Sequence, residues 1–178
     1  MLRILFGALV ALVIALPARA ADGEEVDMGG LKSKAPAAWK KGTPGQMQQA
    51  NFTLPKADGD KEDAKLLIFH GGPAGMGDKD GNIRRYKGMF KAPAGDKAKV
   101  ETTKVGKSEL TTVDIQGIYL FKAAPFDPNA KTEEKPDFRM VAVIFETPKG
   151  PYYLRFIGPQ KSVEKHKKDF DEWLKNFK

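Results

Sequence analysis

The chain contains no cysteine, and that absence excludes several familiar kinds of site. A disulfide framework, a cysteine nucleophile, a thiolate metal centre and a lipidated N-terminal cysteine all require a thiol. Histidine is almost as scarce, because only His70 and His166 are present and they lie far apart in the sequence. Zinc binding is therefore disfavoured, and we expect neither a metal ion nor another cofactor. Without disulfides, a packed core must stabilise the fold.

Serine is also scarce, because residues 21–178 contain only Ser33, Ser108 and Ser162. None of these lies in the Gly-x-Ser-x-Gly pattern that carries the nucleophile of an α/β-hydrolase. The glycine-rich segment near the middle of the chain is not followed by the Lys-Ser/Thr pair of a Walker phosphate loop. No complete catalytic set is present, and we therefore expect a protein that is not an enzyme.

Long hydrophobic runs occur only at the N-terminus. Arg3 gives a positive start, residues 4–16 are apolar, and residues 18–20 have the small-x-small pattern of a cleavage site. The apolar run is shorter than the ~20 residues that a membrane-spanning helix needs. We predict that residues 1–20 are a signal peptide removed after Ala20, and that no transmembrane segment remains. The protein would then be exported, to the periplasm or outside the cell.

Removal of residues 1–20 would lower the net charge from +7 to +5, because Arg3 and Arg19 are lost. The remaining chain has the length of one ordinary domain. Residues 21–30 are acidic and contain glycine, so we expect a flexible N-terminus there. Residues 31–178 are expected to form the single domain.

Alternating or continuous apolar residues, bounded by glycine and proline, predict a series of strands. The expected strands cover residues 46–54, 64–70, 99–105, 109–119, 138–146 and 152–157. The strand over 64–70 is continuously apolar and is expected to lie inside its sheet. Residues 121–137 contain three prolines and predict a long irregular excursion. Most connections have hairpin length, so the sheet should be mainly antiparallel.

Two amphipathic helices complete the expected α+β domain, in which they cover part of the antiparallel sheet. Ile83, Tyr86 and Phe90 lie on one face of the first helix, whose cap we expect to be Asp78 or Asp80. The second helix is predicted over residues 162–178, capped by Ser162. Its apolar stripe includes His166, which we expect to be packed or half-buried.

Four segments resemble a group of secreted bacterial proteins of unknown function. They are "APAAWKK", "MQQANFTLP", "GDKDGNIRRYKGMF" and the C-terminal segment that begins "FETPKGPYYLRFIGP". Asn82, Arg85, Tyr86 and Phe90 match the group's Asn-x-x-Arg-Trp-x-x-x-Phe element, with tyrosine in place of tryptophan. The resemblance implies a PsbP-like fold, an antiparallel sheet between helices. It implies no enzymatic activity and brings no catalytic residues.

The loop after the predicted strand 64–70 is the main candidate site, because His70, Gly71 and Gly72 follow an apolar strand and precede a helix. Such loops can place backbone N–H groups around an oxyanion or a phosphate. A small periplasmic hydrolase or phosphate-handling enzyme that uses residues 70–77 is therefore the alternative function. It predicts a deep pocket at residues 71–77 with a second titratable group near His70. Asp78 and Asp80 oppose the phosphate version, since they would repel an anion at the helix start.

Two acidic runs, at residues 58–63 and 78–82, offer oxygen atoms at the spacing of calcium ligands. An EF-hand loop requires glycine at its sixth position and glutamate at its twelfth. Counted from Asp78, those positions hold Ile83 and Met89. We therefore expect solvated acidic loops rather than calcium sites.

Residues 84–107 contain eight basic and two acidic side chains, a local charge of +6. Arg84, Lys87 and Lys91 could therefore form, beside the glycine loop, a surface that meets an anionic surface or an acidic protein. A solvated surface that aids solubility is the simpler alternative. We do not expect nucleic acid as a partner, because no stacking aromatic residues alternate with the lysines. The leading prediction is an exported, non-enzymatic binding or accessory protein whose partner the sequence leaves unknown.

Overall fold

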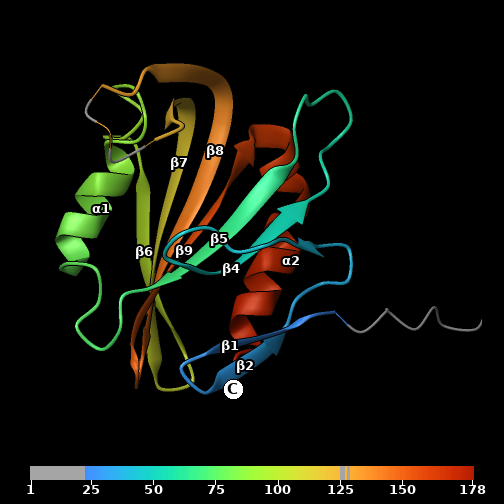
Figure 1. The fold of residues 1–178 in the computed structure, drawn as a ribbon, viewed down its shortest axis with the longest axis vertical. Helices are drawn as coiled ribbons and strands as arrows, with labels where there is room; N and C mark the ends of the chain where they lie inside the picture. The colour runs from blue at the N-terminus through green and yellow to red at the C-terminus, as the bar shows by residue number, and fades with distance from the viewer. Residues whose placement is uncertain (1–22, 125–126, 128) are drawn as a thin grey trace, which may run out of the picture.

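The computed structural model describes residues 23–124, 127 and 129–178, and its main feature is an antiparallel seven-stranded sheet (Figure 1). The strand order is β3-β4-β5-β9-β8-β7-β6. The bounds are β3 Lys40–Lys41, β4 Gln48–Leu54, β5 Ala64–His70, β6 Lys99–Val105, β7 Ser108–Lys122, β8 Thr132–Thr147 and β9 Gly150–Pro159. Every neighbouring pair is antiparallel, and β5 lies between β4 and β9, as its continuous apolar sequence predicted.

Two helices lie on opposite sides of this sheet (Figure 1), α1 over Lys79–Lys87 and α2 over Gln160–Lys175. Side chains alternate between the two faces of each strand, so the sheet contributes to two separate cores. One core packs under α2 and contains Phe156, Phe170 and Trp173. The other packs under α1 and contains Tyr86 and Tyr153. The predicted α+β single domain, an antiparallel sheet covered by two amphipathic helices, is confirmed.

The ends of the two helices differ in part from the prediction. Asp78 caps α1, because its carboxylate accepts a hydrogen bond of 2.7 Å from the Gly81 N–H. Ser162 does not cap α2, which begins at Gln160. Instead, the Ser162 N–H and hydroxyl both donate to the Asp60 carboxylate, at 2.9 and 2.6 Å. A carboxylate from a distant loop therefore satisfies the start of α2, a partnership that local sequence does not reveal.

From Glu25 onward the N-terminal segment forms strands, where the sequence suggested a flexible N-terminus over residues 21–30. Strand β1, Glu25–Met28, pairs with β2, Leu31–Lys34, in an antiparallel hairpin that buries Met28. The backbones of Lys32 and Lys178 exchange two hydrogen bonds, which join the hairpin to the C-terminus. The missed signal is the alternation of Val26 and Met28, a short two-residue pattern.

The predicted irregular excursion over residues 121–137 is also wrong at both ends. β7 continues to Lys122 and β8 already begins at Thr132. Pro136 is accommodated because the register shifts between Gly117 and Tyr119, and Asp137 has a positive φ of 55° at the same point. A bulge leaves one residue outside the ladder, so a proline there costs no hydrogen bond.

The predicted signal peptide, residues 1–20, lies outside the described residues. Among the residues that the structure does describe, no helix has both the length and the apolar character needed to cross a membrane. His166 is buried, as expected, and its Nε2 lies 2.8 Å from the Pro55 carbonyl oxygen.

Candidate functional site

The glycine loop over residues 71–77 is fixed closely against the sheet. The Met76 N–H donates to the Tyr153 hydroxyl at 3.0 Å, and that hydroxyl lies 3.3 Å from the Gly77 carbonyl oxygen. The Asn82 amide holds the same segment, because its Nδ2 donates to the carbonyl oxygens of residues 76–78. Gly75 has a φ of +72°, and a Cβ there would lie 2.7 Å from the Tyr153 hydroxyl. The loop is thus packed on β9, and its glycines permit that approach.

His70, the histidine of the alternative enzyme hypothesis, faces the α2 side of the sheet. Its ring stacks on Tyr152 with 4.3 Å between the ring centroids, and its Nδ1 lies 3.2 Å from the Pro151 carbonyl oxygen. No carboxylate or hydroxyl side chain hydrogen-bonds to His70 within the described part of the chain. Gly71 and Gly72 lie beyond it at the β8–β9 turn, since a Cβ on Gly150 would meet the Gly72 carbonyl oxygen at 2.6 Å.

The N-terminus of α1 is already capped by a carboxylate of the same chain, that of Asp78. The Asp78 carboxylate accepts the Gly81 N–H, and this hydrogen bond holds the pKa of Asp78 below its usual value. A bound phosphate would have to displace that carboxylate. The acidic loop before β5 is similarly engaged, because Asp60 bonds to Ser162 and Asp63 accepts the Lys56 N–H at 2.9 Å. In the described residues, no group of three or more metal-binding side chains comes together.

The basic residues singled out in the sequence lie on the α1 side but are interrupted by acids. Arg84 is exposed, Lys87 is half-exposed, and Lys91 forms a 2.7 Å ion pair with Glu134. On the edge strand β6, Lys99 pairs with Glu101 at 2.7 Å. Arg85 is also exposed, and it lines the cleft described next. The anionic surface or acidic protein suggested for these residues stays a prediction.

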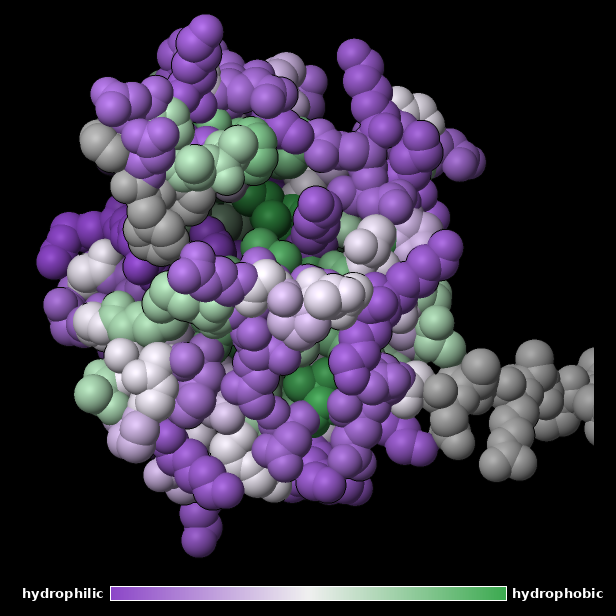
Figure 2. Space-filling view, in the orientation of Figure 1, coloured by the Kyte–Doolittle hydropathy of each residue, from purple (hydrophilic) through white to green (hydrophobic). Residues whose placement is uncertain are grey.

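A hollow with a volume of about 820 Å³ lies on the α1 face of the sheet. Figure 2 shows green, hydrophobic side chains at the bottom of a hollow in the upper half of the view, bordered by purple, hydrophilic and paler green side chains. Its apolar lining residues are Met47, Leu67, Phe69, Met76, Met89, Tyr119, Leu120, Phe121 and Tyr153. The hollow exists because α1 has only nine residues and covers only part of this face. We refer to it as the α1 cleft.

A second, smaller depression of about 530 Å³ lies between β2 and the end of α2. Its lining includes Glu25, Lys32, Lys175 and Lys178, whose long charged side chains remain in water. A site that excludes water from a ligand needs apolar walls and only a few polar groups. The α1 cleft meets that description, and the depression beside β2 does not.

The α1 cleft contains cations without acids. Arg85, Lys122 and Arg155 line it, and its lining includes no aspartate or glutamate among the described residues. Arg155 lies on the sheet itself, with its guanidinium over the Phe69 ring, 4.5 Å from the ring centroid. Burial lowers the pKa of Arg155 because the charged form has lost water.

A second arginine of the sheet, Arg139, forms ion pairs with two carboxylates. Arg139 is buried on the α2 face, where its Nε and one terminal nitrogen donate to Asp114 at 2.9 and 2.7 Å and another reaches Glu164. Arg155 has no ion pair or side-chain hydrogen bond within the residues that the structure describes. The two arginines lie on adjacent strands, so the difference comes from the face on which each lies.

Two tyrosines in the core between α1 and the sheet allow a matched test of the loop contacts. Replacing Tyr153 with phenylalanine removes both hydrogen bonds to the glycine loop and should lower the free energy of unfolding by about 1–2 kcal/mol. Tyr86 is 1% exposed and its hydroxyl makes no hydrogen bond of normal geometry within the described residues. Tyr86→Phe should therefore leave stability unchanged or raise it. Urea unfolding followed by tryptophan fluorescence compares them; equal losses for both variants would contradict the loop contacts.

The comparisons with known proteins bear on the fold. No protein-family model matches the chain, and no curated protein matches it significantly. The solution structure of a PsbP from the cyanobacterium Synechocystis sp. PCC 6803 (CyanoP) is similar, with a TM-score of 0.52 and 10% sequence identity. The match covers 94% of this chain and 98% of that chain. This chain has a PsbP-like fold.

A protein from Bacteroides thetaiotaomicron is also similar in structure, with a TM-score of 0.47 and 13% identity. The match covers 89% of this chain and 48% of that one, so the chain spans about half the length of that protein. The PsbP-like fold agrees with the resemblance seen in the sequence. At 10% identity the similarity to CyanoP establishes the fold alone and leaves the ligand and activity to other arguments.

The residues of the α1 cleft were not predicted as a site. Leu67, Phe69, Tyr119 and Arg155 come from three strands that only the folded sheet brings together. One signal was present in the sequence, because Arg155 interrupts the apolar run of β9. A charge in the middle of an otherwise buried strand needs a partner or a function.

Proposed function

We propose that this chain is an exported, non-enzymatic binding protein that holds a small, largely apolar molecule in the α1 cleft. The cleft itself supports this proposal most strongly: it has the volume of an ordinary small-molecule site and an apolar floor on a rigid sheet. The strands that form the floor belong to one continuous antiparallel sheet. The site is therefore formed before the ligand binds, and little binding free energy is lost in ordering it.

Support for a binding role also comes from the side chains that would be needed for chemistry. His70 faces away from the cleft, and the serines Ser108 and Ser162 are buried. The Ser162 hydroxyl donates a hydrogen bond to Asp60 and accepts one from the Ala57 N–H. The proposal keeps export from the N-terminal sequence pattern, which an N-terminal sequence of the protein isolated from its own cells would test.

Binding of the neutral fluorescent dye N-phenyl-1-naphthylamine tests the cleft directly. We expect the wild-type protein to bind the dye and raise its fluorescence, because the floor around Leu67 and Phe69 is apolar. Leu67→Gln should weaken binding about tenfold, since it removes roughly one buried leucine side chain from the contact. Val100→Gln is the matched control, because Val100 lies on the edge strand β6 and is 41% exposed.

Two results would count against this function. The first is a wild-type protein that does not bind the dye at all. The second is an equal loss of dye binding in Leu67→Gln and Val100→Gln, which would place the dye elsewhere or show a general effect on folding.

A further inference from the structure

Arg155 is the least expected side chain in the α1 cleft. It lies in the middle of β9, between Tyr153 and Ile157 on the same face of the strand. Its neighbours along the strand, Leu154 and Phe156, are fully buried on the opposite face, under α2. The guanidinium lies over the Phe69 ring, with its Cζ 4.5 Å from the ring centroid. A cation–aromatic contact of this kind orients the group and leaves its N–H donors free for another partner.

Among the residues that the structure describes, no acid pairs with Arg155. Burial lowers its pKa, and Tyr119 and Tyr86 act in the opposite direction. Arg85 is a second cation close enough to act in the same direction as burial. Arg139, on the next strand, shows that the fold can supply carboxylates to a buried arginine where its stability requires them. Arg155 thus lacks a carboxylate partner because the described lining of the cleft contains no acid.

The rim of the cleft reinforces the positive charge. Arg85 is held there because one of its terminal nitrogens donates a 2.6 Å hydrogen bond to the side-chain carbonyl oxygen of Asn82. Lys122, the last residue of β7, also lines the cleft. An entering molecule would therefore meet cations at the rim and one oriented guanidinium on the floor, with apolar walls between them.

We propose that the ligand of the α1 cleft is an amphipathic carboxylate, and that Arg155 is the residue that selects it. The planar guanidinium can donate two parallel hydrogen bonds to one carboxylate group. The apolar part of the ligand would lie against Leu67, Phe69 and Phe121. This inference rests on the proposed function, because it names the class of molecule that the same cleft binds.

The experiment is a displacement titration with two probes that have the same hydrocarbon chain, dodecanoate and dodecanol, against bound N-phenyl-1-naphthylamine. On the wild-type protein, dodecanoate should displace the dye at a concentration roughly ten- to a hundredfold lower than dodecanol, the ratio expected for charge-assisted hydrogen bonds. Arg155→Met should remove that preference and leave dodecanol binding unchanged. Arg84→Met, an exposed arginine outside the cleft lining, is the control and should keep the full preference.

A second variant and a stability measurement keep the test decisive. Arg155→Lys retains the charge without the planar fork, so it should lose dodecanoate affinity severalfold. Arg155→Met should unfold at the wild-type temperature or above it, because it removes an unpaired charge from a half-buried site. If Arg155→Met does not fold, the dodecanoate preference of Arg155→Lys shows whether Arg155 selects the carboxylate.

The results separate the two proposals. Failure of the wild-type protein to bind the dye would overturn the proposed function. Dye binding with equal displacement by dodecanoate and dodecanol would leave that function standing and overturn the carboxylate. An unchanged preference in Arg155→Met, or in Arg155→Lys where only that variant folds, would show that Arg155 does not select the ligand.

Discussion

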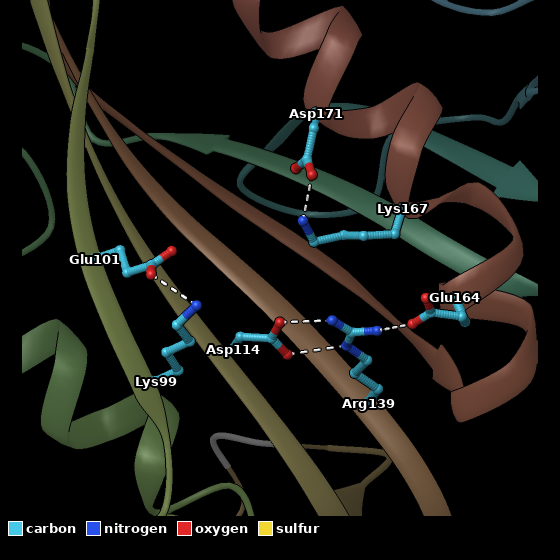
Figure 3. A network of polar contacts seen from close by, with 7 residues as sticks. All are labelled: Lys99, Glu101, Asp114, Arg139, Glu164, Lys167 and Asp171. Carbon is cyan, nitrogen blue, oxygen red and sulfur yellow. Dashed lines mark hydrogen bonds and ion pairs between the residues drawn. The ribbon is translucent and has the colours of Figure 1, made fainter.

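Replacing Arg139 with alanine should lower the free energy of unfolding by about 3 kcal/mol, the cost of leaving a largely buried carboxylate without its partner. Figure 3 shows Arg139 between Asp114 of β7 and Glu164 of α2, with two contacts to Asp114. The Asp114 side chain is 20% exposed, so water replaces the lost guanidinium only in part. The hydrogen bonds to Asp114 raise the pKa of Arg139, which keeps it charged at every pH of interest.

Lys99→Ala is the matched control for Arg139→Ala. Figure 3 also shows the Lys99–Glu101 pair, whose side chains are 72% and 57% exposed. Such a pair contributes less than about 0.5 kcal/mol in most proteins. Urea unfolding of both variants, followed by fluorescence of the two tryptophans, measures the difference. Similar small losses for both would show that Arg139 does not join α2 to the sheet.

Trp173→Ala should cost about 4 kcal/mol, because it removes a large side chain from the centre of the core beneath α2. The Trp173 side chain is 2% exposed. Its ring lies 4.9 Å from that of Phe177, 5.5 Å from Trp39 and 6.0 Å from Phe170, measured between centroids. The Trp39 and Phe170 rings also pack against the sheet through Phe52 and Phe156, which restrains them from filling the space.

Circular dichroism during urea unfolding is the suitable measurement for Trp173→Ala, since the variant loses half of the tryptophan signal. Met47→Ala is the control, because Met47 is 57% exposed and its loss should change stability by less than about 0.5 kcal/mol. If Trp173→Ala does not fold, Trp173→Phe should still cost about 1–2 kcal/mol. A loss below 1 kcal/mol in the alanine variant would contradict the packing of α2 on the sheet.

Much of the fold could be predicted from local patterns. The strand over Ala64–His70 and the apolar stripe of α2 are each contained in one short segment, so periodicity alone located them. The elements that were missed depend on distant partners. Pro136 was placed in an irregular excursion over residues 121–137, whereas a register shift between Gly117 and Tyr119 makes room for it within the β7–β8 pair. Ser162 was taken as a cap, whereas Asp60 provides that contact from a loop about a hundred residues earlier.

The candidate site was harder to predict than the fold. Sequence reasoning concentrated on the glycine loop after His70, where adjacent residues resemble known catalytic loops. In the structure, the loop packs on Tyr153 and contributes Met76 to the edge of the α1 cleft. The floor of the cleft comes from residues of different strands that are neighbours only across the sheet. The spacing of these residues along the chain does not indicate that they meet. The only local signal is the isolated charge of Arg155 in an apolar strand.

The most direct test of the account is NMR of the ¹⁵N-labelled protein with dodecanoate, because it locates the ligand without any substitution. The account predicts that the Arg155 Nε–H signal and the backbone amides of Leu67, Phe69 and Tyr119 shift as the carboxylate is added. The amides of α2, on the other face of the sheet, should stay in place. Shifts confined to another surface, or an Arg155 signal that does not move at saturation, would contradict the assignment of Arg155 and the α1 cleft as the binding site.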